Sequence, residues 1–230
     1  MEKIVIRIGG HLIFSSDEIN VVKLKEISDV LKKAYNEGKK VIVVVGGGDY
    51  ARRYINAAGL LRASEFEKDY LAILITRVNA FLVILALGEI AHQHIPTNIN
   101  EILSISSSTQ KIIVCGGLIP GQSTMSVAAL LAEAIKADML INVTNVEGVY
   151  TFDPKRRPDA KFLKRVSTTE LKEILSKQGI NAGEYELIEQ QAINIVERSK
   201  IPLRIINGNN VENIIDAIYG KDVGTLVIPS

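Results

Sequence analysis

Residues 41–48 read VIVVVGGG, five β-branched aliphatic residues followed directly by three glycines. Such a run is typical of a buried strand, and the glycines mark a sharp turn at its end. Similar aliphatic runs recur along the chain, separated by segments with the apolar spacing of helices. We expect strands near residues 3–8, 40–45, 111–115, 139–144, 203–206 and 224–228. This alternation predicts an α/β fold, a three-layer sandwich with a mainly parallel central sheet.

Several helices can be placed from their start and stop signals. An apolar stripe over residues 22–34 ends at Gly38, which is suited to close a helix. The capping-box spacing S-x-x-E begins at Ser64 and again at Ser167, so each position predicts a helix start. The helix that begins at Ser64 should extend to about Leu87.

Composition limits the classes of partner. With 27 Lys+Arg and 26 Asp+Glu among 230 residues, the net charge is +1, which argues against nucleic acid or a membrane as partner. The sole cysteine, Cys115, excludes an internal disulfide and is expected in the core. We find no run of about 18 uncharged apolar residues and too short an N-terminal apolar run for a signal peptide, so a cytoplasmic location is expected. The charged loop 153–161 is the expected seam between two lobes.

Three glycine-rich corners follow predicted strands. The first corner is Gly9–His11, the second is Gly46–Gly48 with Arg52 one turn later, and the third runs from Gly116 to Thr124. In a parallel sheet all three would open on one edge, where ligands bind. Glycine allows backbone N–H groups to approach a phosphate, and the helix that follows adds positive potential. Glycines can also serve only to permit tight corners, but three together predict a phosphate-binding site.

The third corner and one further turn suggest which parts of a nucleotide each would bind. GGLIPGQS, residues 116–123, has the P-loop spacing but carries Gln122 where lysine is required. A monophosphate is therefore a better ligand for this corner than a triphosphate. The segment TNVEGVYTFDP, residues 144–154, offers a cradle for base and ribose, although a plain surface loop is the alternative.

The motifs VVVGGGDYARRY, KDYLAILITRVNAFL, GGLIPGQSTMSVAALLAE, TNVEGVYTFDP and ERSKI cover nearly the whole chain. Together they closely resemble the archaeal-type uridylate kinases of the amino-acid kinase superfamily. The resemblance implies a single domain of residues 1–230 with the amino-acid kinase (carbamate kinase-like) fold. It implies a UMP-binding lobe of about residues 1–137 and an ATP-binding lobe of about 138–230. It also implies transfer of the ATP γ-phosphoryl group to UMP with Mg²⁺, as a step of pyrimidine biosynthesis, by a homohexamer.

Site residues are carried over from this resemblance position by position, and no metal-ligating side chain is among them. Arg7, Arg52 and His11 are the candidate catalytic residues. The ATP side would comprise Arg7, Gly9, Gly10, His11, Gly48, Arg52, Thr144, Asn145, Tyr150 and Asp153. The UMP side would comprise Gly47, Asp69, Leu118, Ile119, Pro120, Gly121, Gln122, Ser123 and Thr124.

The chain departs from its relatives where the chemistry is expected. Arg7 and His11 stand where such kinases often carry lysine, and Met125 stands where some carry aspartate. These departures leave open which cation meets the transferring phosphoryl group. They also leave open a protein that stores molybdenum or another oxyanion with ATP. A kinase of isopentenyl phosphate is the other alternative, although Asp69 and the polar third corner suit a nucleoside monophosphate better.

Overall fold

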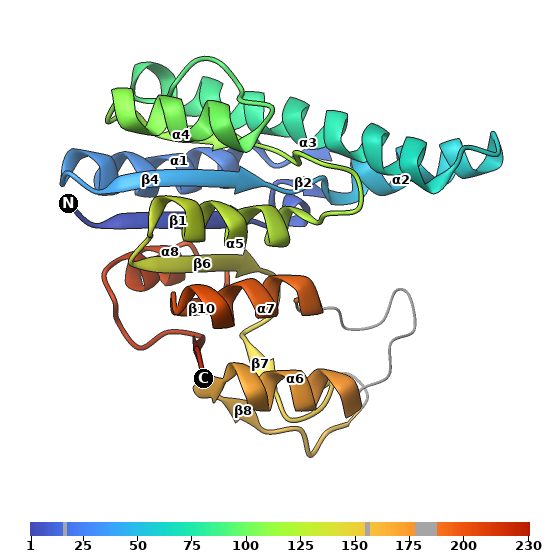
Figure 1. Cartoon of the computed structure of the whole chain (residues 1–230), viewed down its shortest axis with the longest axis vertical. Coiled ribbons are helices and arrows are strands. Elements are labelled where there is room, and N and C mark those ends of the chain that lie inside the picture. Colours follow the sequence, from blue (N-terminus) through green and yellow to red (C-terminus); the bar gives the residue numbers. More distant parts are fainter. Residues whose placement is uncertain (16–17, 155–156, 178–187) are drawn as a thin grey trace.

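The computed structural model of the chain describes residues 1–15, 18–154, 157–177 and 188–230. Its centre is a seven-stranded sheet in the order β5-β4-β1-β6-β10-β11-β9, with helices on both faces (Figure 1). The strands are β5 (Ile113–Cys115), β4 (Lys40–Val45), β1 (Lys3–Ile8), β6 (Met139–Thr144), β10 (Leu203–Asn207), β11 (Thr225–Ile228) and β9 (Arg165–Ser167). Neighbouring strands are parallel except for β10 and β11. The predicted fold class is confirmed.

The six predicted strands all occur, with small differences at their ends. β1, β4 and β6 have the predicted bounds, because their aliphatic runs are buried over nearly their full length. The short edge strand β9 was not predicted. Two small hairpins were also missed, β2 (Phe14–Ser15) with β3 (Glu18–Ile19) and β7 (Val149–Tyr150) with β8 (Phe162–Leu163). Two-residue strands carry too little periodicity to be recognised.

Alternation along β1 assigns its side chains to two cores. Ile4, Ile6 and Ile8 join the cluster beneath α1 (Val21–Asn36), α3 (Glu65–Leu87) and α8 (Glu212–Ile218). Val5 joins the cluster beneath α4 (Ile99–Ser108), α5 (Thr124–Ile135), α6 (Thr168–Lys177) and α7 (Gln190–Ser199). Cys115 is fully buried in this second core, and burial raises its thiol pKa to about 12. It is the core residue that the sequence predicts.

The helix signals correspond to observed ends. Ser64 and Glu67 form a reciprocal capping box at the start of α3, and Ser167 and Glu170 exchange the same two bonds at the start of α6. Gly38 follows α1 at φ +79°, a conformation that glycine adopts without strain. α2 (Gly48–Leu60) and the first half of α3 project together beyond the sheet (Figure 1).

α3 is the one helix in the described residues that is long and apolar enough to cross a membrane, judged by length and composition alone. In the structure it packs against β4, β5, α1 and α2, with Ile73, Ala80, Val83 and Ile84 buried. Core helices of globular proteins commonly share these properties, so α3 does not by itself indicate a membrane protein.

The sheet is continuous between the two halves of the chain. β1 pairs with β4 on one side and with β6 on the other, so the boundary expected near residues 137 and 138 lies between two hydrogen-bonded strands. Residues 155 and 156 of the expected seam at 153–161 lie outside the described residues.

Candidate active site

The first and second corners meet at one rim of the sheet. β1, β4, β5 and β6 are parallel, so their carboxyl ends lie at the same edge. A Cβ atom added to Gly10 would lie 2.2 Å from the Gly48 nitrogen and 2.5 Å from the Gly46 oxygen. Gly48 has φ +64°, and an added Cβ would lie 2.4 Å from the Phe14 carbonyl oxygen. These glycines are therefore required by contact between the corners themselves, whatever ligand they also admit.

β6 brings the start of the turn at residues 144–154 to the same rim. The Gly9 N–H donates to the Val143 carbonyl at 2.8 Å, which places the residues after β6 beside the first corner. Thr144 and Asn145 follow at this edge, whereas Tyr150 lies on β7 and contacts Phe162 edge to face at 5.3 Å. Gly148 lets the β7–β8 hairpin approach Thr225, because an added Cβ would lie 2.3 Å from the threonine Oγ1. Asp153 follows the hairpin strand β7 and is partly buried.

Arg7 on β1 extends from the sheet toward the start of α5. Its Nε lies 3.3 Å from Thr124 Oγ1, and its Nη1 lies 3.4 Å from Asn142 Oδ1. Burial lowers its pKa to about 10, and the negative charge of Glu189 partly opposes this shift. The guanidinium is therefore charged at neutral pH. Because it is partly buried, solvent and salt screen its interaction with nearby charges only weakly.

His11 lies on the short 3₁₀ turn Gly10–Leu12 that follows β1. Its Nε2 is buried and has no hydrogen-bond partner among the described residues. Burial and the positive charges of Arg7 and Arg52 lower its pKa to about 4, with Asp49 acting in the opposite direction. The imidazole is therefore neutral at neutral pH. A buried ring nitrogen at this rim is suited to bond a ligand oxygen.

Arg52 differs from Arg7 in its exposure. Its side chain is 72% exposed on α2, and its Nη1 lies 3.6 Å from Asp49 Oδ1. A side chain this free can move toward a polyphosphate without first breaking a buried bond.

The N-terminus of α5 is already occupied by a carboxylate. Ser123 caps the helix, its Oγ accepting from the N–H groups of Met125 at 3.0 Å and Ser126 at 3.2 Å. Glu189 Oε1 accepts from the hydroxyls of Ser123 and Ser126 and from the Ser126 N–H at 3.2 Å. A phosphate at this helix end would compete with Glu189 for the same donors.

The remaining residues of the third corner differ in their exposure. Asp69 of α3, predicted on the UMP side, accepts from the Gly121 N–H at 2.7 Å and so already holds this corner. Gly121 has φ +80° with open space around an added Cβ, and Ile119 is 50% exposed. Leu118 is buried in the core, whereas Pro120 is partly buried beside it. Gln122 Oε1 is buried without a partner in the described part of the chain.

Sequence reasoning missed Asn142 and Glu189. Asn142 is 1% exposed within the apolar run of β6, and a lone amide in such a run is the signal that could have identified it. Glu189 carries no comparable signal, because 66 residues separate it from Ser123. The described residues contain no group of three or more His, Cys, Asp or Glu that could hold a metal ion.

A sequence model of the amino acid kinase family matches residues 2–207, and the chain therefore belongs to this family. Its curated relatives include two archaeal uridylate kinases. That of Methanobrevibacter smithii is 44% identical over 98% of this chain and 99% of its own length, and that of Sulfurisphaera tokodaii is 40% identical over 99% of each. Within the family, this chain thus resembles the uridylate kinases.

Solved structures agree with this assignment. The uridylate kinase of Archaeoglobus fulgidus superposes with a TM-score of 0.88, at 40% identity, over 99% of this chain and 100% of its own. The aspartate kinase of Synechocystis superposes with a TM-score of 0.75 at 21% identity, over 99% of this chain and 40% of its own, which shows the shared fold alone. The oxyanion-storage and isopentenyl phosphate alternatives are not favoured by these relatives.

Proposed function

We propose that this protein transfers the γ-phosphoryl group of ATP to UMP, forming UDP and ADP, as a cytoplasmic step of pyrimidine nucleotide biosynthesis. The observation that carries the proposal is the meeting of the glycine corners at one rim around Arg7 and His11. The uridylate kinase relatives, which this chain matches over nearly their full length, support the choice of UMP.

The proposed reaction requires no general base. The attacking group is a phosphate oxygen of UMP, and the second pKa of a phosphate monoester is about 6, so this oxygen is largely ionised at neutral pH. The task of the protein is to hold two anions in line and to stabilise charge on the transferring group. Arg7, charged and partly buried, supplies a fixed positive charge at this rim.

His11 and Arg52 complement Arg7 in different ways. The neutral imidazole of His11 can donate one hydrogen bond to a phosphate oxygen without adding charge. Arg52 is exposed on the first turns of α2 and can close over the ATP phosphates with Gly48.

Mg²⁺ would neutralise and align the phosphates when bound. Kinases commonly hold Mg²⁺ through substrate phosphates, waters and one or two carboxylates, rather than in a cage of protein ligands. Asp49 and Glu189 are the carboxylates whose negative charges raise the pKa values of His11 and Arg7, respectively, and this sparse set fits such a role.

The two nucleotides would divide the rim between them. We assign UMP to Gly47, Asp69 and the third corner from Leu118 to Thr124, in the lobe of residues 1–137. We assign ATP to the first corner, Gly48, Arg52, Thr144, Asn145, Tyr150 and Asp153, with its adenosine in the lobe of residues 138–230. The partly buried charge of Arg7 lies beside Thr124, on the side where the two nucleotides would meet.

A coupled assay of ADP release tests the function directly. UMP, CMP, dUMP and isopentenyl phosphate are compared as acceptors at equal concentration, with ATP and Mg²⁺ in excess. We expect UMP to give the highest kcat/KM. Higher kcat/KM with isopentenyl phosphate, or no transfer to UMP, would disprove the proposal.

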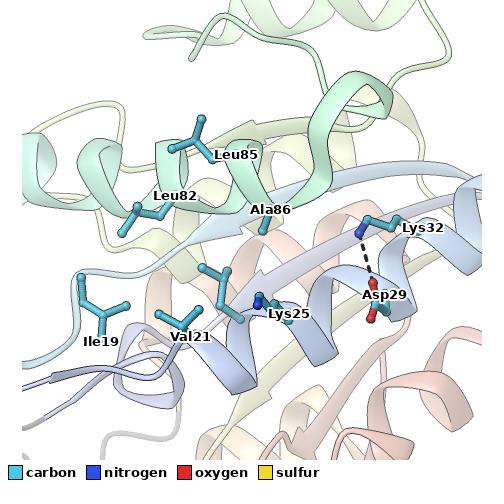
Figure 2. A pocket seen from close by; sticks show the side chains of 9 residues that line it. Ile19, Val21, Lys25, Asp29, Lys32, Leu82, Leu85 and Ala86 are labelled. Atoms are coloured by element: carbon cyan, nitrogen blue, oxygen red, sulfur yellow. Dashed lines mark hydrogen bonds and ion pairs between the residues drawn. The ribbon is translucent and has the colours of Figure 1, made fainter.

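We also propose that the protein assembles through α3, as a homo-oligomer and, by resemblance, a hexamer. Phe66, Tyr70, Leu74, Val78, Phe81 and Leu85 form an apolar stripe along this helix, each between 39% and 65% exposed. Between α3 and α1 lies a groove of about 560 Å³, and Figure 2 shows Leu82 and Ala86 facing Ile19 and Val21 across it. An apolar row of this length on a helix is suited to bury against the same row of a second copy.

A further inference from the structure

Two buried polar side chains interrupt the apolar sequence of α3. Thr76 is 5% exposed and Asn79 is 4% exposed, whereas most other buried residues of this helix are aliphatic. Polar groups are costly to bury unless they are hydrogen-bonded. The partners of these two side chains therefore indicate what the helix gains from carrying them.

Asn79 bonds the second corner. Its Nδ2 donates to the carbonyl oxygens of Gly46 at 3.0 Å and Gly47 at 3.1 Å. One amide group thus fixes two successive peptide units immediately after β4. These are the residues through which the backbone leaves the sheet and enters α2.

Thr76 bonds the third corner. Its hydroxyl donates to the Ile73 carbonyl within α3 at 2.6 Å and accepts from the Gly117 N–H at 2.7 Å. The neighbouring Arg77 adds a longer contact from Nε to the Gly117 carbonyl at 3.4 Å. Gly117 is therefore held through both its N–H and its C=O, in two successive peptide units, by adjacent residues of one helix.

Steric contact makes this attachment tight. A Cβ added to Gly116 would lie 2.4 Å from Thr76 Oγ1 and 2.8 Å from the Arg77 nitrogen. Gly116 thus lacks a side chain because α3 passes directly against it, and not only to admit a ligand. Asp69, nearly two turns earlier, holds the outer tip of the same corner through Gly121.

We propose that Thr76 and Asn79 are positioning residues that set the spacing between the second and third corners, and so between the two phosphates that react. This inference rests on the proposed transfer to UMP. α3 is a rigid rod that touches both corners, and a peptide displaced by about 1 Å in a phosphoryl-transfer site can cost about a hundredfold in rate. Neither side chain is expected to touch substrate.

Four variants test the proposal. Thr76→Val keeps the shape of the side chain and removes the hydroxyl, whereas Thr76→Ser restores it. Asn79→Asp keeps the shape and removes the donor to Gly46 and Gly47. Ile84→Val is the matched control, because Ile84 is buried in the same helix and its loss of a methyl group lowers stability without altering either corner.

Steady-state kinetics should separate the two corners. We expect Thr76→Val to raise KM for UMP about tenfold while KM for ATP changes less than about twofold, and Thr76→Ser to recover most of the loss. We expect Asn79→Asp to lower kcat about tenfold or more, because its corner borders both nucleotides. Kinetic constants of both variants within about twofold of Ile84→Val would overturn the inference.

Amide hydrogen exchange supplies a readout independent of activity. Peptides that cover residues 43–50 and 112–121 should exchange faster in Asn79→Asp and Thr76→Val, respectively, than in Ile84→Val. Unchanged exchange in both peptides would overturn the inference whatever the kinetics. If the wild-type protein does not phosphorylate UMP, the proposed function fails, and the exchange comparison alone then decides whether α3 holds the corners.

Discussion

The guanidinium of Arg7 and the hydroxyl of Thr124 lie 3.3 Å apart, joining the middle of the sheet to the first residue of α5. Replacement of Arg7 by alanine should lower kcat about a hundredfold, or about 2.7 kcal/mol of transition-state stabilisation. Arg7→Lys keeps the charge but loses the planar fork, so we expect an intermediate loss. Single-turnover kinetics with UMP and ATP measure both.

Arg165→Ala is the control for Arg7, because Arg165 is exposed on the edge strand β9. Its kcat should equal that of the wild type. A kcat for Arg7→Ala within about threefold of the wild type, less than about 0.7 kcal/mol, would remove Arg7 from the catalytic set.

His11 should make the protein sensitive to mild acid. Its pKa is about 4 in the folded state, chiefly through burial, and about 6.5 when unfolded. Between about pH 6.5 and pH 4 the unfolded chain binds a proton that the folded chain does not, so this group lowers stability as pH falls. The Tm of the wild type should therefore fall more steeply over that window than the Tm of His11→Asn, measured by thermal denaturation. Parallel curves would contradict the buried, neutral imidazole.

Glu189 should stabilise the N-terminus of α5 through its charge. Glu189→Gln retains an oxygen for the serine donors but removes the negative charge beside the helix end and Arg7. We expect the free energy of unfolding to fall by about 1–2 kcal/mol in urea denaturation. Glu133→Gln is the control on the same helix. Glu133 forms an exposed ion pair with Arg198 at 2.6 Å, which should contribute less than about 1 kcal/mol. Equal losses in the two variants would contradict the role of Glu189.

Gly48 should tolerate no side chain. At φ +64°, with an added Cβ 2.4 Å from the Phe14 carbonyl, Gly48→Ala combines backbone strain with a clash. We expect a loss of more than about 2 kcal/mol in the free energy of unfolding. Gly38→Ala has a similar φ of +79° but open space, so it should cost only about 1 kcal/mol. Chemical denaturation of the two variants separates the cost of backbone strain from that of the steric clash. Equal losses in the free energy of unfolding would refute the proposed contact.

The apolar stripe of α3 should hold copies of the chain together. Val78 is 61% exposed at its centre, and Val78→Glu would place a charge in the buried interface. Light scattering coupled to size exclusion should show the wild type at a multiple of the 25.2 kDa chain mass and the variant at a lower mass. Ile228→Glu, at an exposed position of β11, should leave the mass unchanged. A wild type that elutes as a monomer would exclude this interface.

The parts of the fold that were predicted are those whose signals are local. Aliphatic runs define β1 and β4, and the side chain that caps α3 lies three residues from the group it bonds. The site depends on contacts that are distant in sequence. Glu189 reaches Ser123, and Asn79 reaches Gly46, only after the layers have packed. The glycines show the same limit. The sequence predicted that these glycines let a ligand phosphate approach the backbone. The structure shows a second reason, because the close contact between the corners leaves no room for a side chain at Gly10, Gly46 or Gly48.

In the described part of the chain, β1 alone joins the two halves of the sheet by strand pairing, with β4 and β5 on one side and β6, β10, β11 and β9 on the other. Ile4 pairs with Val41 of β4 on one flank and with Met139 of β6, nearly 100 residues further along the chain, on the other. On a ribosome, one flank of β1 must therefore stay uncovered until β6 has been translated, and this delay exposes it to mispairing. The same strand leads directly into Gly9, Gly10 and His11. In a nascent chain, the rim formed by the glycine corners and the residues after β6 is therefore complete only after the second half of the sheet has docked.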